Sequence, residues 1–492
     1  MDLQVKAGSL VRTIVDQEIS GIVGKIISQL QTDLTSVVAG FLSAGVSASG
    51  MLKLENRLAE CARESARKIL QWLVANMEPK LEKMPGVIKH KGKNFRRLAE
   101  KTDRGSVVTC FGNIELSRAR YRQGRDGKTI FPLELLLGIE AGFTPSAANM
   151  IGKQFATSGS SQGRTREMIL KRTGVSVGNE KLRKLTSLLA ESFEPLREAT
   201  QLQELMRLIK DTWISGETPV LSISRDGVAL GLAPWSIFEM AGLASISVLS
   251  NGKKLGTVYL SNTPQSNQED LSRNLTSLLT EVVRACGGDL PKIVYVTDAG
   301  KIETAYWKNV LRKFFVDGVR IPIVRVVDYY HASERLTTIA EALKVDTDAR
   351  STWLTHMRKT LLEPNGHGRV LRSIAHMKAT YKYKSSLAAD GRKAEAYLRR
   401  YKRFMDYEGA RSQGFPIASG IVESTCKQIV SERMKLSGMR WHREGAQQVM
   451  SLHSILLSNI WSKVFDKWLQ SKPTVRDLMP QCATKNQFLN GA

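Results

Sequence analysis

The order of apolar and polar residues predicts alternating strands and helices in the middle of this chain of 492 residues. Five short runs there are rich in β-branched and apolar residues, which is typical of buried strands. Apolar residues at helical spacing follow the third run over 270–285 and the fourth run over 301–315. A connecting helix returns the chain to the end of the sheet at which the previous strand began. The later strands should therefore run parallel to the first. The five runs are residues 219–225, 242–250, 254–260, 292–297 and 321–327.

This succession of three strands, helix, strand, helix and strand is the order found in RNase H-like domains. We expect residues 216–328 and 415–465 to form such a domain, an α/β fold around a mixed five-stranded sheet. Residues 329–414 have a helical pattern and are expected to be a helical insertion into this domain. Asn251-Gly252 stands between the second and third runs and predicts a tight hairpin turn.

The first 130 residues are predicted to be mostly helical. Residues 51–78 place apolar side chains on one stripe of a helix, and two β-rich runs around Phe111-Gly112-Asn113 predict a hairpin. The stretch from Leu34 to Leu52 has no charge and has the length of a membrane span. Its glycines and hydroxyl residues make it too polar for a membrane, so we expect a flexible or buried segment of a soluble protein.

Residues 131–215 are helical again and contain a candidate helix-turn-helix for DNA binding. One helix ends at Thr173-Gly174, and a second begins at about Val177, with Val175 placed to fill the angle between the two helices. A helix-turn-helix would place the basic start of the second helix in a major groove. An ordinary helical hairpin with a solvated basic face is the alternative. The basic residues there are Lys181, Arg183 and Lys184.

Composition adds a polyanionic partner to this picture. The chain has 72 Lys and Arg residues against 47 Asp and Glu, a net charge of +25, which indicates nucleic acid and, less often, an anionic membrane. Basic residues concentrate between Lys378 and Arg403 with tyrosines interleaved, a pattern that suits DNA contact and equally a helical core. The five widely spaced cysteines form no CxxC pair, which favours a reduced cytoplasmic protein over a zinc ribbon.

Three carboxylates stand where predicted strands or helices meet loops. Asp226 ends the first strand, Asp298 ends the fourth strand, and Glu423 lies near the start of a late helix. If the first and fourth strands are neighbours, the two aspartates emerge side by side, and the late helix can bring Glu423 to them. Clustered carboxylates repel one another unless a cation joins them, and Mg²⁺ or Mn²⁺ prefers oxygen ligands. Two such ions about 3.5–4 Å apart promote in-line phosphoryl transfer.

Each of these acids also has an ordinary structural explanation. Asp226-Gly227 is a common pair in hairpin turns, and Asp298 can cap the helix that follows it. Glu423 stands four residues before Lys427, which is the spacing of a surface ion pair on a helix. Taken singly, these explanations are the more frequent ones, whereas the three acids together in this strand order favour a metal site.

Two segments carry a resemblance to a known family. The stretches PIASGIVESTCKQIVSERMKLSGMRWHREGAQQVMSLHSI and VVDYYHASERL resemble the DDE transposases of bacterial insertion sequences, in particular the ISKra type. The second stretch is also similar to an element of Mutator-like transposases. The resemblance covers roughly residues 220–460. It implies that Asp226, Asp298 and Glu423 form a catalytic triad that holds Mg²⁺ or Mn²⁺, in a pair of ions.

The chain departs from that family at the second acid. The family has a glycine after this aspartate, whereas Ala299 follows Asp298 here, which leaves Asp328 as a competitor for the role. Asp328 also follows an apolar strand and can equally cap the helix that opens at Tyr329. The resemblance gives His331 a catalytic role, as a hydrogen-bond partner of a scissile phosphate or a bound water. A half-buried histidine packed against the sheet is the alternative.

Together, these features predict a bacterial DNA transposase that nicks and joins DNA, located in the cytoplasm at the nucleoid. Its partners would be double-stranded DNA, at terminal inverted repeats and at the target, and further copies of itself in a dimer or larger assembly. A membrane is not expected. Residues 1–130 are expected to serve DNA binding or oligomerisation, and 466–492 form a C-terminal tail. The residues expected to contact DNA are Lys181, Arg183, Lys184, Lys382, Lys384, Arg399, Arg400, Arg403, Lys427, Arg440 and Trp441.

Two other functions and one structural alternative stay open. A DNA-binding protein derived from a transposase would keep the scaffold without the chemistry, and an RNase H-like nuclease would cut DNA without joining it. Trp441 could stack on a DNA base beside a phosphate bound by Arg440, but a tryptophan on a helix is more often a core residue.

Overall fold

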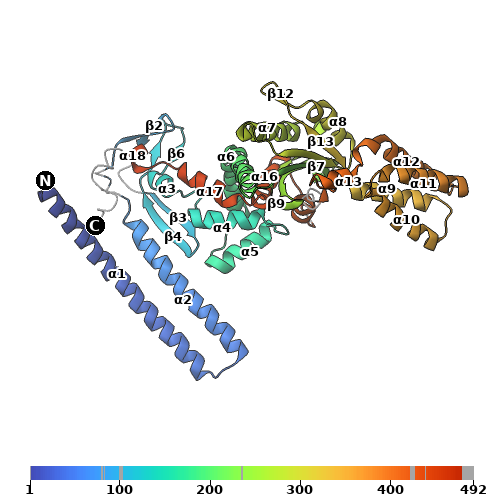
Figure 1. Cartoon of the computed structure of the whole chain (residues 1–492). Coiled ribbons are helices and arrows are strands. Elements are labelled where there is room, and N and C mark those ends of the chain that lie inside the picture. Colours follow the sequence, from blue (N-terminus) through green and yellow to red (C-terminus); the bar gives the residue numbers. More distant parts are fainter. Residues whose placement is uncertain are drawn as a thin grey trace. The chain divides into compact units, whose positions relative to one another are not determined.

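The computed structural model describes residues 2–78, 81, 84–98, 103–233, 237–420, 427–437 and 439–478 (Figure 1). The chain divides into two compact units. The first comprises Met1–Phe155, Ser161–Leu189 and Phe465–Ala492, and the second comprises Ala156–Ser160 and Ala190–Val464. Helix α6 (Asn179–Ile214) belongs to the first unit at its start and to the second thereafter. Among the described helices, none combines the length and apolar character that crossing a bilayer requires.

A hairpin of two long helices opens the first unit. Helix α1 (Asp2–Ser43) packs against helix α2 (Ala48–Ala75), which includes most of the helix predicted over 51–78 (Figure 1). Ser47 caps α2, because its hydroxyl accepts the Gly50 N–H at 3.0 Å. The expectation of a buried segment over 34–52 is wrong, since this stretch forms the exposed tip of the helical hairpin, and its flexibility stays a prediction. Two helices share only one contact seam, so apolar residues outside the seam meet solvent.

The remainder of the first unit consists of short strands and helices. The β3–β4 hairpin predicted around Phe111-Gly112-Asn113 is confirmed, and a four-stranded sheet with the order β1-β2-β5-β6 lies in the same unit. Helix α18 packs on β1 and adds Leu478 to the core of this sheet. The strands are β1 (Val87–His90), β2 (Lys93–Arg97), β3 (Asp103–Thr109), β4 (Gly112–Arg118), β5 (Tyr121–Arg122) and β6 (Thr129–Ile130). The helices are α3 (Pro132–Leu136), α4 (Pro145–Ala156), α5 (Gln162–Thr173) and α18 (Val475–Leu478).

The corner between α5 and α6 follows the predicted turn in part. Gly174 has a φ of 72° and its N–H bonds the carbonyl of Leu170 at 2.8 Å, so the helix ends where the glycine predicted it. The expected role of Val175 is wrong: Val177 is the buried residue of the corner, and Val175 is partly exposed. Helix α6 then runs for 36 residues. The DNA-reading function of this helix pair stays a prediction.

The second unit is built on a mixed five-stranded sheet with the order β13-β10-β7-β8-β9. β10 pairs in parallel with both β7 and β13, whereas β7, β8 and β9 form an antiparallel meander. Asn251 and Gly252 both have positive φ, 49° and 73°, as a two-residue hairpin turn requires. The sheet and this turn confirm the sequence-based prediction. The strands are β7 (Val220–Leu232), β8 (Ile237–Ser250), β9 (Lys253–Asn262), β10 (Lys292–Thr297) and β13 (Ile323–Val327).

Strand β7 is longer than predicted. Asp226 does not end this strand and is not in a turn, because it pairs with Leu243 inside the β7–β8 ladder, and Gly227 pairs with Gly242. The two glycines leave room for the side chain of Gln268, which packs close to both. Glycine has a low intrinsic preference for strands, so local sequence does not predict that β7 continues beyond residue 226. Pairing with β8 extends the strand there.

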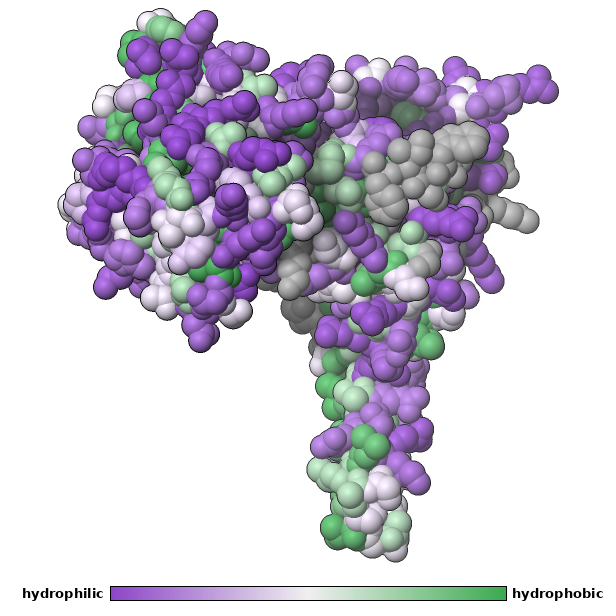
Figure 2. Space-filling model, turned by 90° about the vertical axis from the view of Figure 1, so that its right-hand side faces the viewer, coloured by the Kyte–Doolittle hydropathy of each residue, from purple (hydrophilic) through white to green (hydrophobic). Residues whose placement is uncertain are grey.

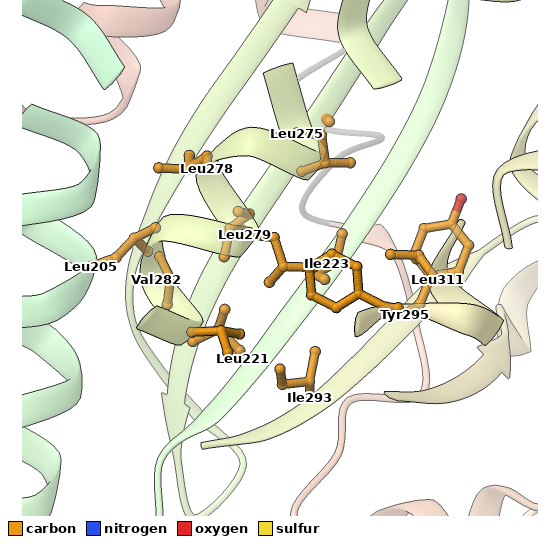
Figure 3. Packing of buried hydrophobic residues seen from close by; sticks show 14 of the residues in the cluster. Leu205, Leu221, Ile223, Leu275, Leu278, Leu279, Val282, Ile293, Tyr295 and Leu311 are labelled. Carbon is orange, nitrogen blue, oxygen red and sulfur yellow. The ribbon is translucent and has the colours of Figure 1, made fainter. Parts of the chain in front are cut away.

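Helices cover both faces of this sheet. On one face, Leu278 and Leu279 of α7 pack against Ile223 of β7 and Tyr295 of β10 (Figure 3). The helices on this side are α7 (Glu269–Cys286), α8 (Lys301–Asn309) and the second part of α6. A small hairpin that the sequence pattern did not predict joins α8 to β13, through β11 (Phe315–Val316) and β12 (Val319–Arg320).

The other face packs against the helical insertion. Val294 and Val296 of β10 lie in one core with Leu336 of α9 and Leu398 of α12. Alternate residues of β10 therefore enter two different cores, which explains its continuous apolar sequence. The insertion consists of α9 (Tyr329–Ala342), α10 (Thr347–Leu361), α11 (Gly366–Thr380), α12 (Ala388–Tyr401) and α13 (Tyr407–Ser412).

The chain returns to the sheet after the insertion. Helix α16 (Arg443–Leu457) packs on β9, where the Ser454 and Ser261 hydroxyls lie 2.7 Å apart. Between insertion and α16, the described residues include α15 (Glu432–Met434), and α17 (Trp461–Gln470) follows α16. The outer edge of the sheet is thus covered by the C-terminal part of the chain.

Candidate active site

The parallel register aligns three aspartates at the carboxyl end of the sheet. Continued by one or two residues, the ladders bring Asp298, which directly follows β10, opposite Asp226 of β7 and opposite Asp328, which directly follows β13. The N–H of Asp328 donates to the carbonyl of Thr297 at 2.9 Å, which continues the ladder. Adjacent strands are about 4.8 Å apart, so the three residues form one acidic row. The last pairs of the two ladders are Val296 with Ser224 and Thr297 with Val327.

The carboxylates of Asp226 and Asp298 each accept a hydrogen bond from a nearby backbone N–H. Oδ1 of Asp226 accepts the N–H of Gly227 at 2.7 Å, and Oδ1 of Asp298 accepts the N–H of Gly300 at 2.9 Å. Helix α8 begins after Gly300 without a side-chain cap, so the capping explanation for Asp298 fails. Both aspartates are partly exposed.

Asp328 has a different environment from the other two. It is 2% exposed, and its Oδ1 accepts the N–H groups of Tyr330 at 2.7 Å and His331 at 3.1 Å, which caps α9. Its Oδ2 accepts the hydroxyl of Ser419 at 2.7 Å and also the backbone N–H of Ser419. This carboxylate is occupied by four hydrogen bonds within the protein. The geometry therefore favours Asp298 over Asp328 as the second acid.

The loop after Asp298 is held by two tyrosines of the insertion. The hydroxyl of Tyr397 donates to the carbonyl of Asp298 at 2.6 Å, and that of Tyr401 donates to the carbonyl of Ala299 at 3.2 Å. Burial raises the pKa of Tyr397, and the charge of Asp298 raises it further, so the hydroxyl keeps its proton to donate. The sequence pattern left the interleaved tyrosines ambiguous, and these two join the insertion to the acidic row.

Ala299 occupies a backbone conformation that alanine seldom adopts. Its φ is 64° and its side chain is buried. A left-handed residue with a Cβ costs about 1–2 kcal/mol, whereas glycine adopts this conformation freely. The glycine that the resemblance leads one to expect at this position would fit the same loop.

A further carboxyl group beside the row was missed by the sequence analysis. Glu303 lies in the first turn of α8 and is 7% exposed. Burial raises the pKa of Glu303, and the charges of Asp298 and Asp226 add to this increase, against the opposing charge of Arg225. Glu303 and the two aspartates therefore share one electrostatic environment. The sequence offered one signal for Glu303: it is an acid in the first turn of the helix that follows β10 and Asp298.

His331 lies in the first turn of α9, directly after the residues that Asp328 caps. Its Nδ1 is 3.2 Å from Oε2 of Glu334, and its side chain is 31% exposed. The ring is half-buried, as the structural alternative expected, and it stays partly open to solvent near the acidic row. Its catalytic role stays a prediction.

The structure distinguishes among the basic residues expected at the start of α6. Arg183 and Lys184 are exposed. Lys181 instead lies with its Nζ 4.9 Å from the ring centre of Phe143, and burial lowers its pKa. A cation–π contact of this kind occupies the ammonium group within the first unit. Arg183 and Lys184 are thus the better placed pair for a phosphate.

The basic residues of the insertion are mostly at its surface. Arg399 forms an ion pair with Glu395 at 2.8 Å, and the guanidinium of Arg403 lies 4.6 Å from the ring centre of Phe404. Lys384 is partly buried. The exposed members of the predicted DNA-contact set in this region are Lys382, Arg399, Arg400 and Arg403.

Arg440 and Trp441 differ in exposure. Arg440 is exposed and lines a cavity of about 650 Å³ between the end of β7 and residues 434–442. The indole N–H of Trp441 donates to the carbonyl of Met434 at 2.8 Å, and the guanidinium of Arg433 lies 5.7 Å from the ring. These contacts favour the core explanation for Trp441. Stacking on a base stays a prediction.

Glu423 lies outside the described residues, and so does the side chain of Lys427. Within the described part of the chain, no three His, Cys, Asp or Glu side chains converge closely enough to hold a metal ion. Asp226 and Asp298 supply two adjacent carboxylates, the ligand type that Mg²⁺ and Mn²⁺ prefer. Burial is the main cause of the raised pKa of Glu303, and a cation would relieve the repulsion from Asp298 and Asp226 that adds to it. The described donors therefore fit part of a divalent-cation site.

Comparison with other proteins gives no family assignment. No family model matches the sequence, and no curated protein matches it. The functional proposal therefore depends on the acidic row, the charge of the chain and the sequence motifs.

Replacing Asp328 should destabilise the protein more than replacing Asp298. Asp328→Ala removes a helix cap and leaves the buried donors of Ser419 without a partner, which should cost about 3 kcal/mol of unfolding free energy. Asp298→Ala removes one local hydrogen bond and should change stability by less than about 1 kcal/mol. Urea unfolding measures both. Equal losses for the two variants would contradict the assignment of Asp328 as a structural cap.

Position 299 should accept glycine and reject a β-branched residue. Ala299→Gly removes backbone strain but loses a buried methyl group, so the unfolding free energy should change by less than about 1 kcal/mol. Ala299→Val adds a branched side chain to the same left-handed backbone and should cost more than about 2 kcal/mol. Thermal unfolding compares the pair, and a tolerated valine would show that the loop has another conformation.

Proposed function

We propose that this chain is a DDE-type DNA transposase of the kind found in bacterial insertion sequences, with an RNase H-like catalytic domain. The observation that carries the proposal is the register that aligns Asp226 and Asp298 on neighbouring parallel strands. The third acid would be Glu423. Glu423 follows Ser419 by four residues in the sequence. The Ser419 hydroxyl donates a hydrogen bond to Asp328, which belongs to the acidic row. The strand order and the resemblance of the segment around Glu423 add support.

The proposed site would hold two Mg²⁺ or Mn²⁺ ions between Asp226, Asp298 and Glu423. When bound, these ions neutralise the charge that builds up on a phosphate during in-line displacement. Asp298 is kept in place for this task by Tyr397 and Gly300. His331 follows Asp328 by three residues in the first turn of α9, and its ring would donate a hydrogen bond to a phosphate oxygen.

The reaction would have two displacements at phosphorus. A water molecule attacks the phosphodiester at the element end, and the bond to the 3′ oxygen breaks, which leaves a 3′-hydroxyl and a 5′-phosphate. That hydroxyl then attacks a phosphodiester of the target, and a new strand bond replaces the one that breaks there. Both nucleophiles come from water or DNA, so the chain forms no covalent intermediate.

The charge of the chain supports DNA as the substrate. A net charge of +25 favours a polyanion, and the exposed arginines and lysines of α6 and the insertion offer phosphate contacts. The protein would act in the bacterial cytoplasm at the nucleoid. A transposase-derived binding protein without chemistry and a nuclease without joining activity are the competing functions.

Loss of either described acid should abolish chemistry and spare DNA binding. Asp226→Ala and Asp298→Ala should each lower cleavage of a labelled terminal-repeat duplex at least about a thousandfold, because both would hold the ions. Glu423→Ala should do the same. Chelation should stop the wild-type reaction, and Mg²⁺ should restore it. Asp390→Ala, which changes an exposed acid of the insertion, is the control and should keep full activity.

The same assay separates the competing functions. Joined donor and target strands on a denaturing gel support the transposase, whereas cleaved ends without joined product indicate a nuclease. Binding without any metal-dependent cleavage indicates a protein that has lost its chemistry. An active Asp298→Ala variant together with an inactive but folded Asp328→Ala variant would move the second acid to Asp328.

The tyrosine contact predicts a role for the insertion in chemistry. Tyr397→Phe removes one hydrogen bond to the Asp298 carbonyl and keeps the ring, so strand transfer should slow about five- to tenfold and should need more Mg²⁺ for half-maximal rate. Tyr381→Phe is the matched control, since this tyrosine packs in the same core and its ring is kept. DNA affinity should be unchanged in both. An unchanged Mg²⁺ dependence in Tyr397→Phe would refute the positioning role.

A further inference from the structure

Two arginines are buried in the sheet beside the acidic row, on the face that packs against α7 and α8. Arg225 is 1% exposed and Arg325 is 5% exposed, whereas hydrophilic residues dominate the surface shown in Figure 2. Successive side chains of a strand point to opposite faces, so Arg225 lies on the other face from Asp226, which follows it on β7. Arg325 of β13 and Ile223 of β7 both pair with Tyr295 of β10, which places the two arginines on one face.

The guanidinium group of Arg225 is surrounded by an aromatic ring and neutral polar groups. It lies 4.4 Å from the ring centre of Tyr306. It donates to the hydroxyl of Ser272 at 2.9 Å and to Oε1 of Gln268 at 3.1 Å. These partners hold the group in place but do not neutralise its charge. Arg225 forms no ion pair with any described residue.

Arg325 is enclosed in a similar way. Its guanidinium lies 4.8 Å from the ring centre of Phe404 and 5.6 Å from that of Tyr401. It donates to the hydroxyl of Thr304 at 2.9 Å. The faces of aromatic rings attract a cation, which offsets part of the loss of hydration. Arg325 also has no ion pair among the residues that the structure describes, so both buried charges lack a local carboxylate partner.

A buried cation without such a partner is unfavourable unless charges further away compensate it. The acidic row and Glu303 supply negative charge at this end of the sheet. Burial raises the pKa of Glu303, and the positive charge of Arg225 lowers it, so the two groups act on each other. An apolar side chain would fill the same space without the loss of hydration. The presence of two charged side chains therefore indicates that their charge has a role.

We propose that Arg225 and Arg325 are positioning residues that provide a fixed countercharge for the acidic row. They reduce the repulsion among the carboxylates before any metal ion binds, and they oppose binding of the ions until a phosphate adds its negative charge. Mg²⁺ commonly binds through one or two carboxylates together with substrate phosphates, so weak binding to the protein alone suits this chemistry. The inference rests on the proposed function, because it concerns the same candidate metal site.

The test measures binding of Mn²⁺ alone to the full-length chain without DNA, by titration calorimetry at low salt. Arg225→Met keeps much of the side-chain volume and removes the charge, so it should lower the dissociation constant at least about threefold. A unit charge about 12 Å from a divalent ion changes binding by that factor even at the dielectric constant of water. A purely structural role predicts the opposite direction, because a displaced Asp226 would bind Mn²⁺ more weakly.

Three further variants separate charge from packing. Arg325→Met should tighten Mn²⁺ binding in the same direction from a different strand, so the test does not depend on the folding of one variant. Arg225→Lys keeps the charge and should retain the wild-type dissociation constant within about twofold. Arg284→Met is the matched control, since it removes an exposed arginine near the C-terminal end of α7 and should leave Mn²⁺ binding unchanged.

The outcomes distinguish this inference from the proposed function. A wild type without saturable Mn²⁺ binding, or with binding that survives in Asp226→Ala and Asp298→Ala, would contradict the proposed metal site and the countercharge together. Wild-type binding that needs both aspartates, with unchanged or weaker binding in whichever arginine-to-methionine variant is folded by circular dichroism, would overturn the countercharge alone. Equally tight binding by Arg284→Met would also overturn it, since any lost charge would then have the same effect.

Discussion

The parallel pairing of β10 with β7 and β13 is the constraint on which the remaining structure depends. Side chains alternate between the two faces of a strand, so a slip of one residue would turn Asp298 away from Asp226. Burial on both faces prevents such a slip, because Val296 packs against the insertion and Tyr295 against α7 and α8. The apolar cores thus set the positions of the acids.

The insertion is a structural part of the candidate site. The hydroxyls of Tyr397 and Tyr401 donate hydrogen bonds to backbone carbonyls of the loop that carries Asp298. The carboxylate of Asp328 caps α9 and also accepts a hydrogen bond from the Ser419 hydroxyl. Like charges gathered at one end of the sheet repel one another: burial is the main cause of the raised pKa of Glu303, and the charges of Asp298 and Asp226 add to it. Hydrogen bonds from the insertion hold the loop in place against that repulsion, so the packing of the insertion and the geometry of the acids are physically connected.

Much of the fold could be predicted from local patterns, and less of the site could be. Residues 292–297 form the expected strand because their apolar run suits a position between two cores. Asn251-Gly252 forms the expected turn because few residue pairs accept two positive φ angles. The end of β7 was misplaced at Asp226, since pairing with β8 and not local preference extends the strand. Glu303 was missed because its burial depends on neighbours far away in the sequence.

By itself, the sequence determined the order of the elements in the sheet, the excess of positive charge and the position of Asp298 directly after a strand. These properties depend on local periodicity and composition, which act over a few residues. Only the tertiary structure decided that Asp328 is occupied as a cap, that Tyr397 reaches Asp298, and that the apolar tip of the first hairpin is exposed. Each of these depends on which distant segments meet, and that is settled by packing of the whole chain and not by any one stretch of it.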